Sequence, residues 1–412
     1  MQKIMVVNAG SSSLKFQMIE MPESKNEKHE PVVLIEGNFE RIGIENPIVS
    51  YKIPDKDGNV QKFEKNLPLP THAKAVEELM NILINHHIVS SLSEIAGIGH
   101  RIVHGGVNFT SSREVTPSVI EELKSVVDLA PLHGRAHLMG IEGFKAALPD
   151  AFQVVVFDTA FHQTMADEAY MYAVPLEWYT EHKVRKYGFH GISHQYVSRK
   201  AAQFLGKPVE ELRLITAHIG NGGSLCAVKY GKCVDTSMGF TPLDGIVMGS
   251  RSGSIDPAVL DYVSQKENIG LHDLITILNK KSGYYGLTGK SDARDVHKLQ
   301  KEGDYHADLV LRMQEKRIAD YIGSYFVYMG GVDAIVFTAG IGEKSPETRA
   351  AVCKRLEEAL GVEIDLEKNQ VRGELACISK PTSKIKVLVV PTNEELVIAR
   401  EVVRLKDGLT FE

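Results

Sequence analysis

The sequence of 412 residues lacks several features that mark whole classes of protein. It has no run of about 18 or more apolar residues, so we expect no membrane-spanning helix. The formal net charge is −6, so we expect no nucleic-acid surface. The N-terminal apolar stretch is too short for a signal peptide. Its four cysteines (Cys226, Cys233, Cys353, Cys377) show no C-x-x-C spacing, as in reduced structural thiols of a cytoplasmic protein.

Several catalytic and nucleotide motifs are absent as well. Neither G-x-x-x-x-G-K-[ST] nor G-x-G-x-x-G occurs, which excludes the common P-loop and dinucleotide fingerprints. Ser12–Lys15 fits S-x-x-K, but the S-D-N and K-T-G motifs that accompany it in acyl-enzymes are missing, and so is G-x-S-x-G. His190 and His194 are four residues apart without the glutamate of H-E-x-x-H. A serine hydrolase is therefore disfavoured.

The composition is that of a globular chain, with 43% hydrophobic and 24% charged residues. Its length exceeds one ordinary hydrophobic core, so we expect two domains. The apolar spacing predicts an α/β organisation, and Glu23–Glu30 predicts a charged surface loop. Strands are expected at Lys3–Val7, Leu14–Ile19, Val32–Gly37, Ile48–Ile53, Ile95–Arg101 and Val154–Phe157, and helices at Ala73–His87, Pro117–Leu129 and Arg135–Leu148.

The second half of the chain repeats the opening pattern. IMVVNAGSSSLKFQMIE and LRLITAHIGNGGSLCAVKYG both predict a strand, a turn of small residues and a second strand. VDAIVFTAGIGEKSPETRAAV predicts a strand, a glycine turn and a helix, for which Ser345 is a suitable N-cap and Pro346 a suitable first residue. A final strand, Val387–Val390, precedes a helix in PTNEELVIAREVV. The repeat favours two related α/β lobes with a cleft between them.

Each turn of small residues has two interpretations. Glycine and serine commonly form tight hairpins, and successive exposed N–H groups also form a nest for anions. Gly220–Ser224 is the clearest candidate for a nest, because its glycines let a ligand approach the backbone closely. Three such turns together favour a phosphate cradle.

Cationic and acidic residues follow the predicted strands or lie in glycine-rich loops. Arg101 and Arg251 are suited to hold a carboxylate or phosphate, although an ordinary ion pair is an equal alternative for either one. His190 lies in a loop beside an aromatic residue, which suits an anionic ligand with a small apolar end. Asp158 and Glu394 are candidates to organise Mg²⁺. For His100, His104, His137 and His194 we expect structural hydrogen bonds.

The chain resembles the acetate kinase family, within the acetate and sugar kinase, Hsp70 and actin superfamily, over essentially its whole length. The resemblance is carried by VVNAGSSSLKF, GHRIVHGG, LAPLHG, VVVFDTAFH, KYGFHGISH, AHIGNGGS, TPLDG-x-x-MGSRSG, SDARDV, FTAGIGEKS and VPTNEELVIAR. It implies a duplicated ribonuclease H-like (actin-like ATPase) fold and a homodimer. It also implies reversible phosphorylation of acetate to acetyl phosphate by ATP, with Mg²⁺ or, as an alternative, Mn²⁺. The implied lobes are residues 1–158 with 396–412, and residues 159–395.

The resemblance also implies a role for each matching residue. Asn8 and Glu394 match the magnesium site, and Asp158, His190 and Arg251 match catalytic positions. Arg101 matches the position that binds the substrate carboxylate, and Val103, Leu132, Phe189 and Pro242 match the pocket for its methyl group. The phosphate and adenosine positions correspond to Lys15, His218, Ile219, Gly220, Asn221, Gly222, Asp292, Ala293, Arg294, Gly340, Ile341, Gly342, Glu343 and Lys344.

This chain departs from the family pattern at three places. Gly134-Arg135 replaces the usual Asn-Pro, Lys344 replaces an Asn, and Val107-Asn108 replaces Glu-Lys. Two alternative functions share the motifs in whole or in part. A propionate kinase would share all of them, whereas a non-catalytic, ATP-switched binding protein would have no use for Arg101, His190 and a small acyl pocket.

Overall fold

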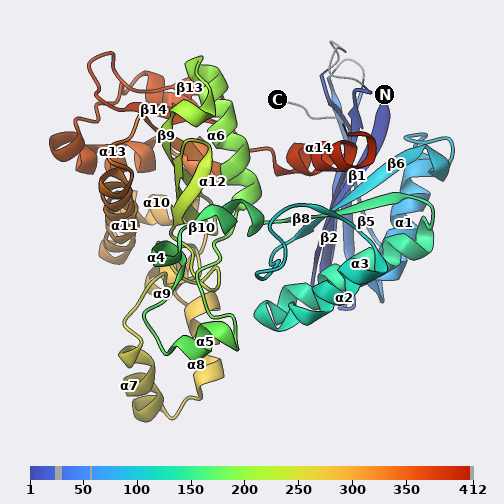
Figure 1. Cartoon of the computed structure of the whole chain (residues 1–412), viewed down its shortest axis with the longest axis horizontal. Helices are drawn as coiled ribbons and strands as arrows, with labels where there is room; N and C mark the ends of the chain where they lie inside the picture. Colours follow the sequence, from blue (N-terminus) through green and yellow to red (C-terminus); the bar gives the residue numbers. More distant parts are fainter. Residues whose placement is uncertain (24–29, 56–57, 409–412) are drawn as a thin grey trace. The chain divides into compact units, whose positions relative to one another are not determined.

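The computed structural model describes residues 1–23, 30–55 and 58–408, with the backbone alone at positions 131 and 132. The chain forms two compact units (Figure 1). The first unit comprises Met1–Ala160 with Asn393–Glu412, and the second comprises Phe161–Thr392, whereas the sequence predicted divisions after Asp158 and Glu395. Residues 24–29 of the predicted surface loop lie outside the described residues. No helix in the described ranges is long and apolar enough to cross a membrane.

The first unit is built on an eight-stranded sheet with the order β5-β4-β3-β2-β1-β6-β8-β7. The strands β1 to β5 form consecutive antiparallel pairs, and β6 and β8 extend the sheet in parallel from β1. The strands are β1 (Gln2–Gly10), β2 (Ser13–Met21), β3 (Val32–Glu40), β4 (Ile48–Pro54), β5 (Val60–Asn66), β6 (Ile95–Ile102), β7 (Arg113–Glu114) and β8 (Phe152–Phe157).

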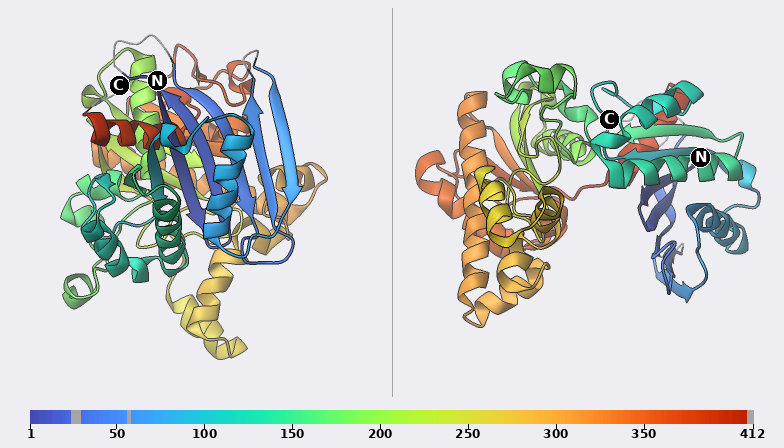
Figure 2. Two further views of the ribbon diagram at one scale, coloured as in Figure 1. Left: turned by 90° about the vertical axis from the view of Figure 1, so that its right-hand side faces the viewer. Right: turned by 90° about the horizontal axis from the view of Figure 1, so that it is seen from below.

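The two faces of this sheet carry different helices. Along β6, side chains alternate between the faces. His100 contacts Phe144 of α3 on one face, and the glycines at positions 97 and 99 let α14 approach on the other. The left view in Figure 2 shows α1 in front of the strands. The helices of this unit are α1 (His72–Asn85), α2 (Pro117–Ser125), α3 (Pro131–Ala147) and α14 (Glu394–Asp407), with the 3₁₀ turns η1 (Leu92–Glu94) and η2 (Val127–Leu129).

One predicted helix is interrupted in the structure. The sequence predicted a helix over Pro117–Leu129, but α2 ends at Ser125 and a separate 3₁₀ turn follows. The next helix begins at Pro131 and not at Arg135, because proline is well suited to the first turn of a helix. The backbone of Ala130 lies outside the helical region and separates the 3₁₀ turn η2 from α3.

The second unit contains a six-stranded sheet with the order β11-β10-β9-β12-β14-β13. Its first five positions repeat the pattern β3-β2-β1-β6-β8: two antiparallel neighbours followed by two parallel strands. The structure therefore confirms the predicted duplication. The strands are β9 (Arg213–Ile219), β10 (Gly223–Lys229), β11 (Lys232–Thr236), β12 (Ala334–Thr338), β13 (Ala376–Cys377) and β14 (Lys386–Val389).

Helices cover both faces of the second sheet. Figure 1 shows α6 on one face and α11 with α13 on the other, and the right view in Figure 2 shows α11 as the longest helix. The helices are α4 (Asp167–Tyr170), α5 (Leu176–Thr180), α6 (Gly191–Leu205), α7 (Ala258–Glu267), α8 (Leu271–Lys280), α9 (Gly283–Thr288), α10 (Ala293–Lys301), α11 (Tyr305–Met329), α12 (Ala339–Lys344) and α13 (Pro346–Leu360). The 3₁₀ turns are η3 (Ala160–Thr164), η4 (Val209–Glu211) and η5 (Lys368–Gln370).

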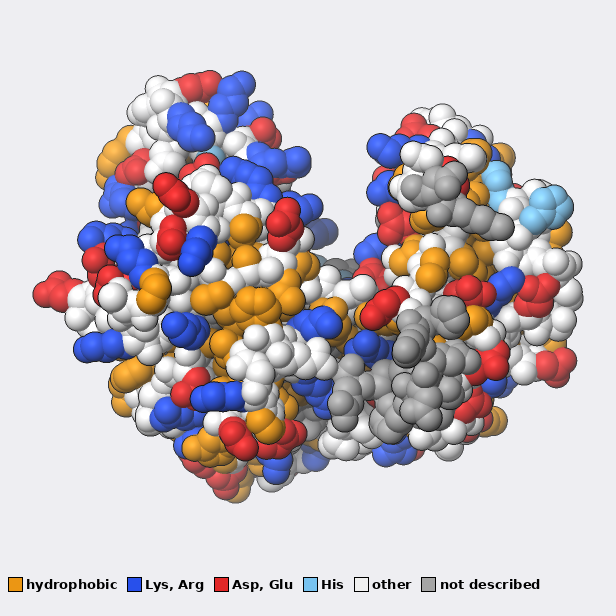
Figure 3. All heavy atoms as spheres, turned by 90° about the horizontal axis from the view of Figure 1, so that it is seen from above, with side chains coloured by type: hydrophobic (Ala, Val, Ile, Leu, Met, Phe, Trp, Pro, Cys, Tyr) orange, Lys and Arg blue, Asp and Glu red, His pale blue; other side chains and the backbone are white. Residues whose placement is uncertain are grey.

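The predicted turn at Gly340–Lys344 is a short helix, α12, entered through Ala339 in the left-handed backbone region. The predicted N-cap of the following helix is confirmed, because the Ser345 hydroxyl caps α13 by accepting a hydrogen bond from the Thr348 backbone N–H. On the face shown in Figure 3, cationic and anionic side chains are interspersed. This distribution agrees with the small net charge of −6.

Candidate functional site

Polar side chains gather on the face of the first sheet that α14 covers. Asn8 and Lys15 lie opposite each other in the β1–β2 pairing, and Arg101 lies near the end of β6. Glu394 and Glu395 occupy the first turn of α14. These five residues line one cavity of about 50 Å³. The fold therefore collects four residues predicted for the phosphates, metal and substrate: Asn8, Lys15, Arg101 and Glu394.

Arg101 is held by Asp158, which directly follows β8. Its Nε donates to Oδ1 at 3.0 Å and its Nη2 to Oδ2 at 2.7 Å. The Asp158 side chain is only 2% exposed. Burial by itself lowers the pKa of Arg101, but the nearby carboxylates of Asp158, Glu394 and Glu395 outweigh it and raise the pKa. Arg101 is thus a fixed positive charge with a defined orientation.

The start of α14 presents two carboxylates to this cavity. Lys15 Nζ forms an ion pair with Glu395. Burial raises the pKa of Glu395, but the charge of Lys15 prevails and lowers it. In contrast, Oε1 of Glu394 is buried and has no hydrogen-bond partner among the described residues. An amide oxygen from Asn8 and this carboxylate oxygen are ligands that suit Mg²⁺.

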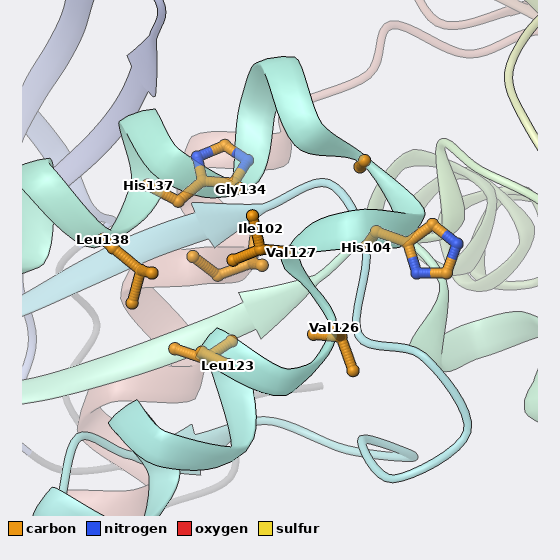
Figure 4. Close-up of a pocket in the computed structure, with 9 residues that line it drawn as sticks. Ile102, His104, Leu123, Val126, Val127, Gly134, His137 and Leu138 are labelled. Carbon is orange, nitrogen blue, oxygen red and sulfur yellow. The ribbon is translucent and has the colours of Figure 1, made fainter.

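Val103 is tied to α3 through a histidine. Its backbone N–H donates to Nε2 of His137 at 3.2 Å, and burial lowers the pKa of His137 to about 3, so the ring is neutral and accepts. Leu132 lies near the start of the same helix, α3, five residues before His137. Figure 4 shows a small cavity behind this segment, lined by residues that include His104 and His137. Its volume of about 10 Å³ barely reaches that of one water molecule, so it is not the acyl pocket.

The structure confirms structural hydrogen bonds for the other three histidines. Nε2 of His100 bonds to Gln153 at 2.8 Å, and Nδ1 of His104 accepts from the Gly106 backbone N–H at 3.0 Å. His194 bonds to hydroxyls of β9 and β10. All three rings are buried. Burial lowers the pKa of His100 and of His104 to about 4, so both remain neutral at pH 7.

The second unit contains a large pocket of about 750 Å³. Most of its lining comes from three segments far apart in the sequence: the β9–β10 turn, the start of α10 and the helix α12. The volume is within the range that binds small-molecule cofactors. Predicted nucleotide residues that line it are Gly220, Asn221, Asp292, Ala293, Arg294, Gly340, Ile341 and Lys344.

Other predicted nucleotide residues lie beside the pocket. His218, Ile219 and Gly222 belong to the strand and turn that carry Gly220, and Gly342 is buried within α12. The Glu343 carboxylate accepts hydrogen bonds from the backbone N–H groups of Ala339 and Thr392 at 2.8 and 3.1 Å. Glu343 thereby joins α12 to the segment after β14.

The start of α10 is held by a local ion pair. Asp292 caps the helix by accepting from the Arg294 backbone N–H at 2.8 Å, and it also accepts from the Arg294 guanidinium at 2.6 and 3.0 Å. These hydrogen bonds lower the pKa of Asp292 to about 2.

Several lining residues were not predicted from the sequence. Arg372 contributes a cation and donates a hydrogen bond to the Lys344 backbone carbonyl. The remaining unpredicted residues are Gly249, Tyr284, Ser291, His297, Lys301, Ser345 and Glu347. Three of them lie within stretches that carry the family resemblance: Gly249 in MGSRSG, Ser291 in SDARDV and Ser345 in FTAGIGEKS.

His190 is positioned by a network beneath it. The ring stacks on that of His218 with 4.1 Å between centroids, and Nδ1 bonds to the Ser224 hydroxyl at 2.9 Å. Ser224 also bonds to His194 at 2.8 Å, and His194 to Thr216 at 2.7 Å. Burial lowers the pKa of His194 well below its ordinary value. Ser224 ends the Gly220–Ser224 turn that the sequence predicted as an anion nest, whereas Thr216 was not predicted. Their alternation on paired strands places both side chains on one face.

Arg251 lies close to His190 and the β9–β10 turn. A Cβ atom on Gly222 would lie 3.3 Å from Arg251 Nη1 and 3.8 Å from the His190 ring. Nη1 donates to the Pro242 carbonyl at 3.2 Å. Burial lowers the pKa of Arg251, and no carboxylate in the described ranges forms an ion pair with it. This cation is therefore available to an anionic ligand.

Comparison with known proteins identifies the family. The model of the acetokinase family matches residues 3–400. This chain belongs to the acetokinase family. An acetate kinase from Geobacillus sp. (strain WCH70) is 50% identical over 406 residues, which cover 98% of this chain and 99% of the relative.

Solved structures of the acetokinase family have the same fold. The Porphyromonas gingivalis acetate kinase matches with a TM-score of 0.92 and 41% identity, covering 98% of this chain and all of that one. A propionate kinase from Francisella tularensis matches with a TM-score of 0.89 and 40% identity over 97% and 99% of the two chains. These matches confirm the predicted α/β fold with two related sheets.

One departure from the family pattern has a packing explanation. A Cβ atom on Gly134 would lie 3.1 Å from Cα of Val127, so glycine allows α3 to pack closely on η2. The other departure near a predicted site, Lys344, places a cation on the wall of the large pocket.

Proposed function

We propose that this chain transfers the γ-phosphoryl group of ATP directly to the carboxylate of acetate, reversibly giving acetyl phosphate and ADP. Its family membership makes it a phosphotransferase with acetate kinase activity, and the family uses ATP. One observation carries the residue assignments: the bare Gly222 position faces both Arg251 and His190, next to the large pocket that Gly220 and Asn221 line. This is the arrangement that a bound phosphate chain requires.

The chemistry needs charge neutralisation more than proton abstraction. Acetate is ionised at pH 7, so no strong general base is required. Two anions must be aligned while charge on the transferred phosphoryl group is compensated. We assign Arg101 to the acetate carboxylate, and Arg251 and His190 to the phosphoryl group. Because Asp158 makes two hydrogen bonds to Arg101, its proposed role is to position that guanidinium.

The acyl group is assigned to the four residues of the predicted methyl pocket. Phe189 is buried, with 2% of its surface exposed, and its carbonyl accepts a hydrogen bond from His162. The Pro242 carbonyl accepts from Arg251. Val103 is fixed by His137. We propose that each of these contacts holds its own segment of backbone in place.

We propose Asn8 and Glu394 as the protein ligands of Mg²⁺ or Mn²⁺. The buried, unpartnered oxygen of Glu394 and the amide of Asn8 suit a hard cation that also retains water and binds phosphate oxygens. When bound, such an ion neutralises phosphate charge and orients the phosphate chain.

The test is acid-dependent formation of acyl phosphate. Enzyme, ATP and Mg²⁺ are incubated with acetate, propionate, butyrate or no acid, and the product is trapped with hydroxylamine. We expect strong acetate-dependent hydroxamate. ATP binding without any acid-dependent product would reject the proposal and favour a nucleotide-switched binding protein.

Propionate is the second candidate substrate, because the propionate kinase structure resembles this chain nearly as closely as the acetate kinase structure. One methylene contributes only about 1–3 kcal/mol to discrimination. The ratio of kcat/KM for acetate and propionate decides between them, and a higher value for propionate would reject acetate as the preferred acid.

Direct transfer predicts inversion of configuration at phosphorus. The measurement uses ATP whose γ-phosphorus is made chiral with oxygen isotopes. Retention would instead indicate a phosphoenzyme.

We also propose a cytoplasmic homodimer. Large apolar side chains of the second unit are exposed, including Leu176 at 61%, Trp178 at 50% and Tyr262 at 64%, and exposed apolar surface of this kind favours an interface. The four thiols are free, as expected in a reducing compartment. Light scattering should give about twice the chain mass of 45.5 kDa, and a mass of one chain would reject the dimer.

A further inference from the structure

Three metal-ligating side chains, none of them assigned a role above, meet in the core of the second unit. They are His162 in η3, Cys226 in β10 and Cys233 in β11. All three are fully buried. Nδ1 of His162 lies 3.1 Å from Sγ of Cys233 and 3.9 Å from Sγ of Cys226, and the two sulfurs are 3.4 Å apart. Within the described ranges, no other group of three His, Cys, Asp or Glu side chains converges in this way.

The histidine ring is oriented as in a metal site. Its Nε2–H donates to the Phe189 carbonyl at 2.8 Å. In this tautomer Nδ1, which lies 3.1 Å from Sγ of Cys233, is the acceptor nitrogen, and a neutral imidazole of this kind is the form that ligates metals. A backbone carbonyl that fixes the tautomer and orientation of a ligating histidine is a regular feature of metal centres.

The separations of the three atoms fit a tetrahedral ion better than they fit a disulfide. With bonds of about 2.3 Å to sulfur and 2.0–2.1 Å to nitrogen, a tetrahedral Zn²⁺ has ligand–ligand edges of roughly 3.5–3.8 Å. The observed separations of 3.1, 3.4 and 3.9 Å bracket these edges. A disulfide instead requires the sulfurs to approach to about 2.05 Å, and it makes no use of the imidazole nitrogen that faces them.

We propose that His162, Cys226 and Cys233 bind a thiophilic divalent cation of the Zn²⁺ class. Two thiolates and a neutral imidazole balance the double positive charge, so the complex is neutral in a core where a net charge would be costly. The thiol protons pass to the buffer on binding. Soft sulfur ligands favour Zn²⁺ over Mg²⁺, which separates this centre from the oxygen ligands at Asn8 and Glu394.

A metal ion bound to these three side chains is also expected to affect the segment that carries Gly188, Phe189 and His190. The His162 ring supports Phe189, and a Cβ atom on Gly188 would lie only 2.8 Å from the same ring. The next residue, His190, has a left-handed backbone, with φ of 56°. Because a small shift of His162 acts directly on this short segment, zinc should lower kcat. This part of the inference rests on the proposed function.

The binding test uses full-length protein stripped of metal with a chelator. Zn²⁺ is titrated in competition with a chromophoric chelator, and Co²⁺ is added separately to detect thiolate-to-cobalt charge transfer in the near ultraviolet. The variants are Cys226→Ser, Cys233→Ser and the double variant. Cys353→Ser is the matched control, because Cys353 is also buried and free but lies in α13.

We expect about one tightly bound Zn²⁺ per chain and a cobalt charge-transfer band in the wild type and in Cys353→Ser. Both should be lost in the double variant. If that variant does not fold by circular dichroism, either single variant should still weaken zinc binding by at least about 10-fold. Zinc binding that is absent in the wild type, or unchanged in the cysteine variants, would overturn the proposal. A metal-free Cys226–Cys233 disulfide in the purified protein would also overturn it.

The kinetic test compares kcat of zinc-loaded and zinc-free enzyme with saturating Mg²⁺ and ATP. We expect a several-fold lower kcat with zinc in the wild type and no zinc effect in the double variant. Equal kcat in both wild-type forms would overturn the coupling. Absence of acid-dependent product in every form would reject the proposed function, while the binding test would still decide the metal site.

Discussion

Single buried charges set the chemistry of this molecule. Arg101 is surrounded by carboxylates and is oriented by two hydrogen bonds, whereas Arg251 is partly buried with only a backbone carbonyl and a methionine sulfur as described partners. The first arrangement fixes a guanidinium in place, and the second leaves a positive charge uncompensated until an anion binds.

Replacing Arg251 with Ala should therefore damage catalysis much more than stability. We expect kcat to fall roughly 10²–10³-fold, the scale for losing one donor to transition-state charge. Arg317→Ala is the matched control, because Arg317 contacts a backbone carbonyl in the same unit but has no assigned role. Steady-state kinetics of both variants measure the effect. A near-normal kcat for Arg251→Ala would contradict its assignment.

Buried neutral histidines should make the folded state sensitive to acid. The pKa of His100 is about 4 in the folded protein and about 6.5 in an unfolded chain, so the unfolded state binds more protons between these values. The free energy of unfolding therefore decreases as the pH falls from about 6.5 towards 4. At about pH 5, His100 alone should contribute a loss of about 2 kcal/mol.

Urea denaturation at about pH 7 and pH 5 measures this loss in the wild type and in His100→Asn. We expect the variant to lose less stability than the wild type between the two pH values, since it has no ring to protonate. Equal losses would show that His100 does not cause the acid sensitivity.

At the scale of elements, the approach of α14 to β6 determines where the predicted metal ligand Glu394 lies. Glycines on one face of β6 allow Ile398 and Val402 of α14 to reach the strand. This contact places the first turn of α14, with Glu394 and Glu395, beside Arg101. Small residues in a strand thus have a function in positioning a helix terminus.

Gly99→Ala should destabilise the first unit, because the new Cβ would lie 2.3 Å from Ile398 Cγ2. We expect a loss of about 1–3 kcal/mol in the free energy of unfolding, as in other overpacked cores. Gly323→Ala is the control: its Cβ would meet no atom within 4 Å, and alanine in the middle of α11 should stabilise by about 0.5–1 kcal/mol. Urea unfolding compares the two, and equal stabilities would refute the packing argument.

At the scale of the whole molecule, the assigned residues are divided between the two units. The large pocket belongs entirely to the second unit, whereas Asn8, Lys15 and Glu394 belong to the first. Adenosine and Mg²⁺-ATP should therefore leave different patterns of protection, because only ATP carries the phosphates assigned to residues of the first unit.

Hydrogen exchange measured by mass spectrometry tests this division. Adenosine should protect the second unit alone, chiefly the segments at Gly220, Asp292 and Gly340. Mg²⁺-ATP should protect these and also the β1–β2 turn and the start of α14. If Mg²⁺-ATP leaves the first unit unchanged, the assignments of Asn8, Lys15 and Glu394 are wrong.

The sequence by itself determined the family, the duplicated α/β fold and most of the strands, because strands, caps and glycine turns depend on residues a few positions apart. Ser345 and Pro346 illustrate this, since the cap they predict is present. The long helical region from Ala258 to Met329 was not predicted.

Only the tertiary structure decided which distant residues meet. Arg101 and Asp158 are 57 positions apart, and His162 is 71 positions from Cys233. Arg372 joins the pocket of Asp292 and Gly340 without any local signal. Such pairings follow from which strands are neighbours and which face each side chain occupies. Short-range patterns do not contain that information, because strand order is set by the packing of the whole unit.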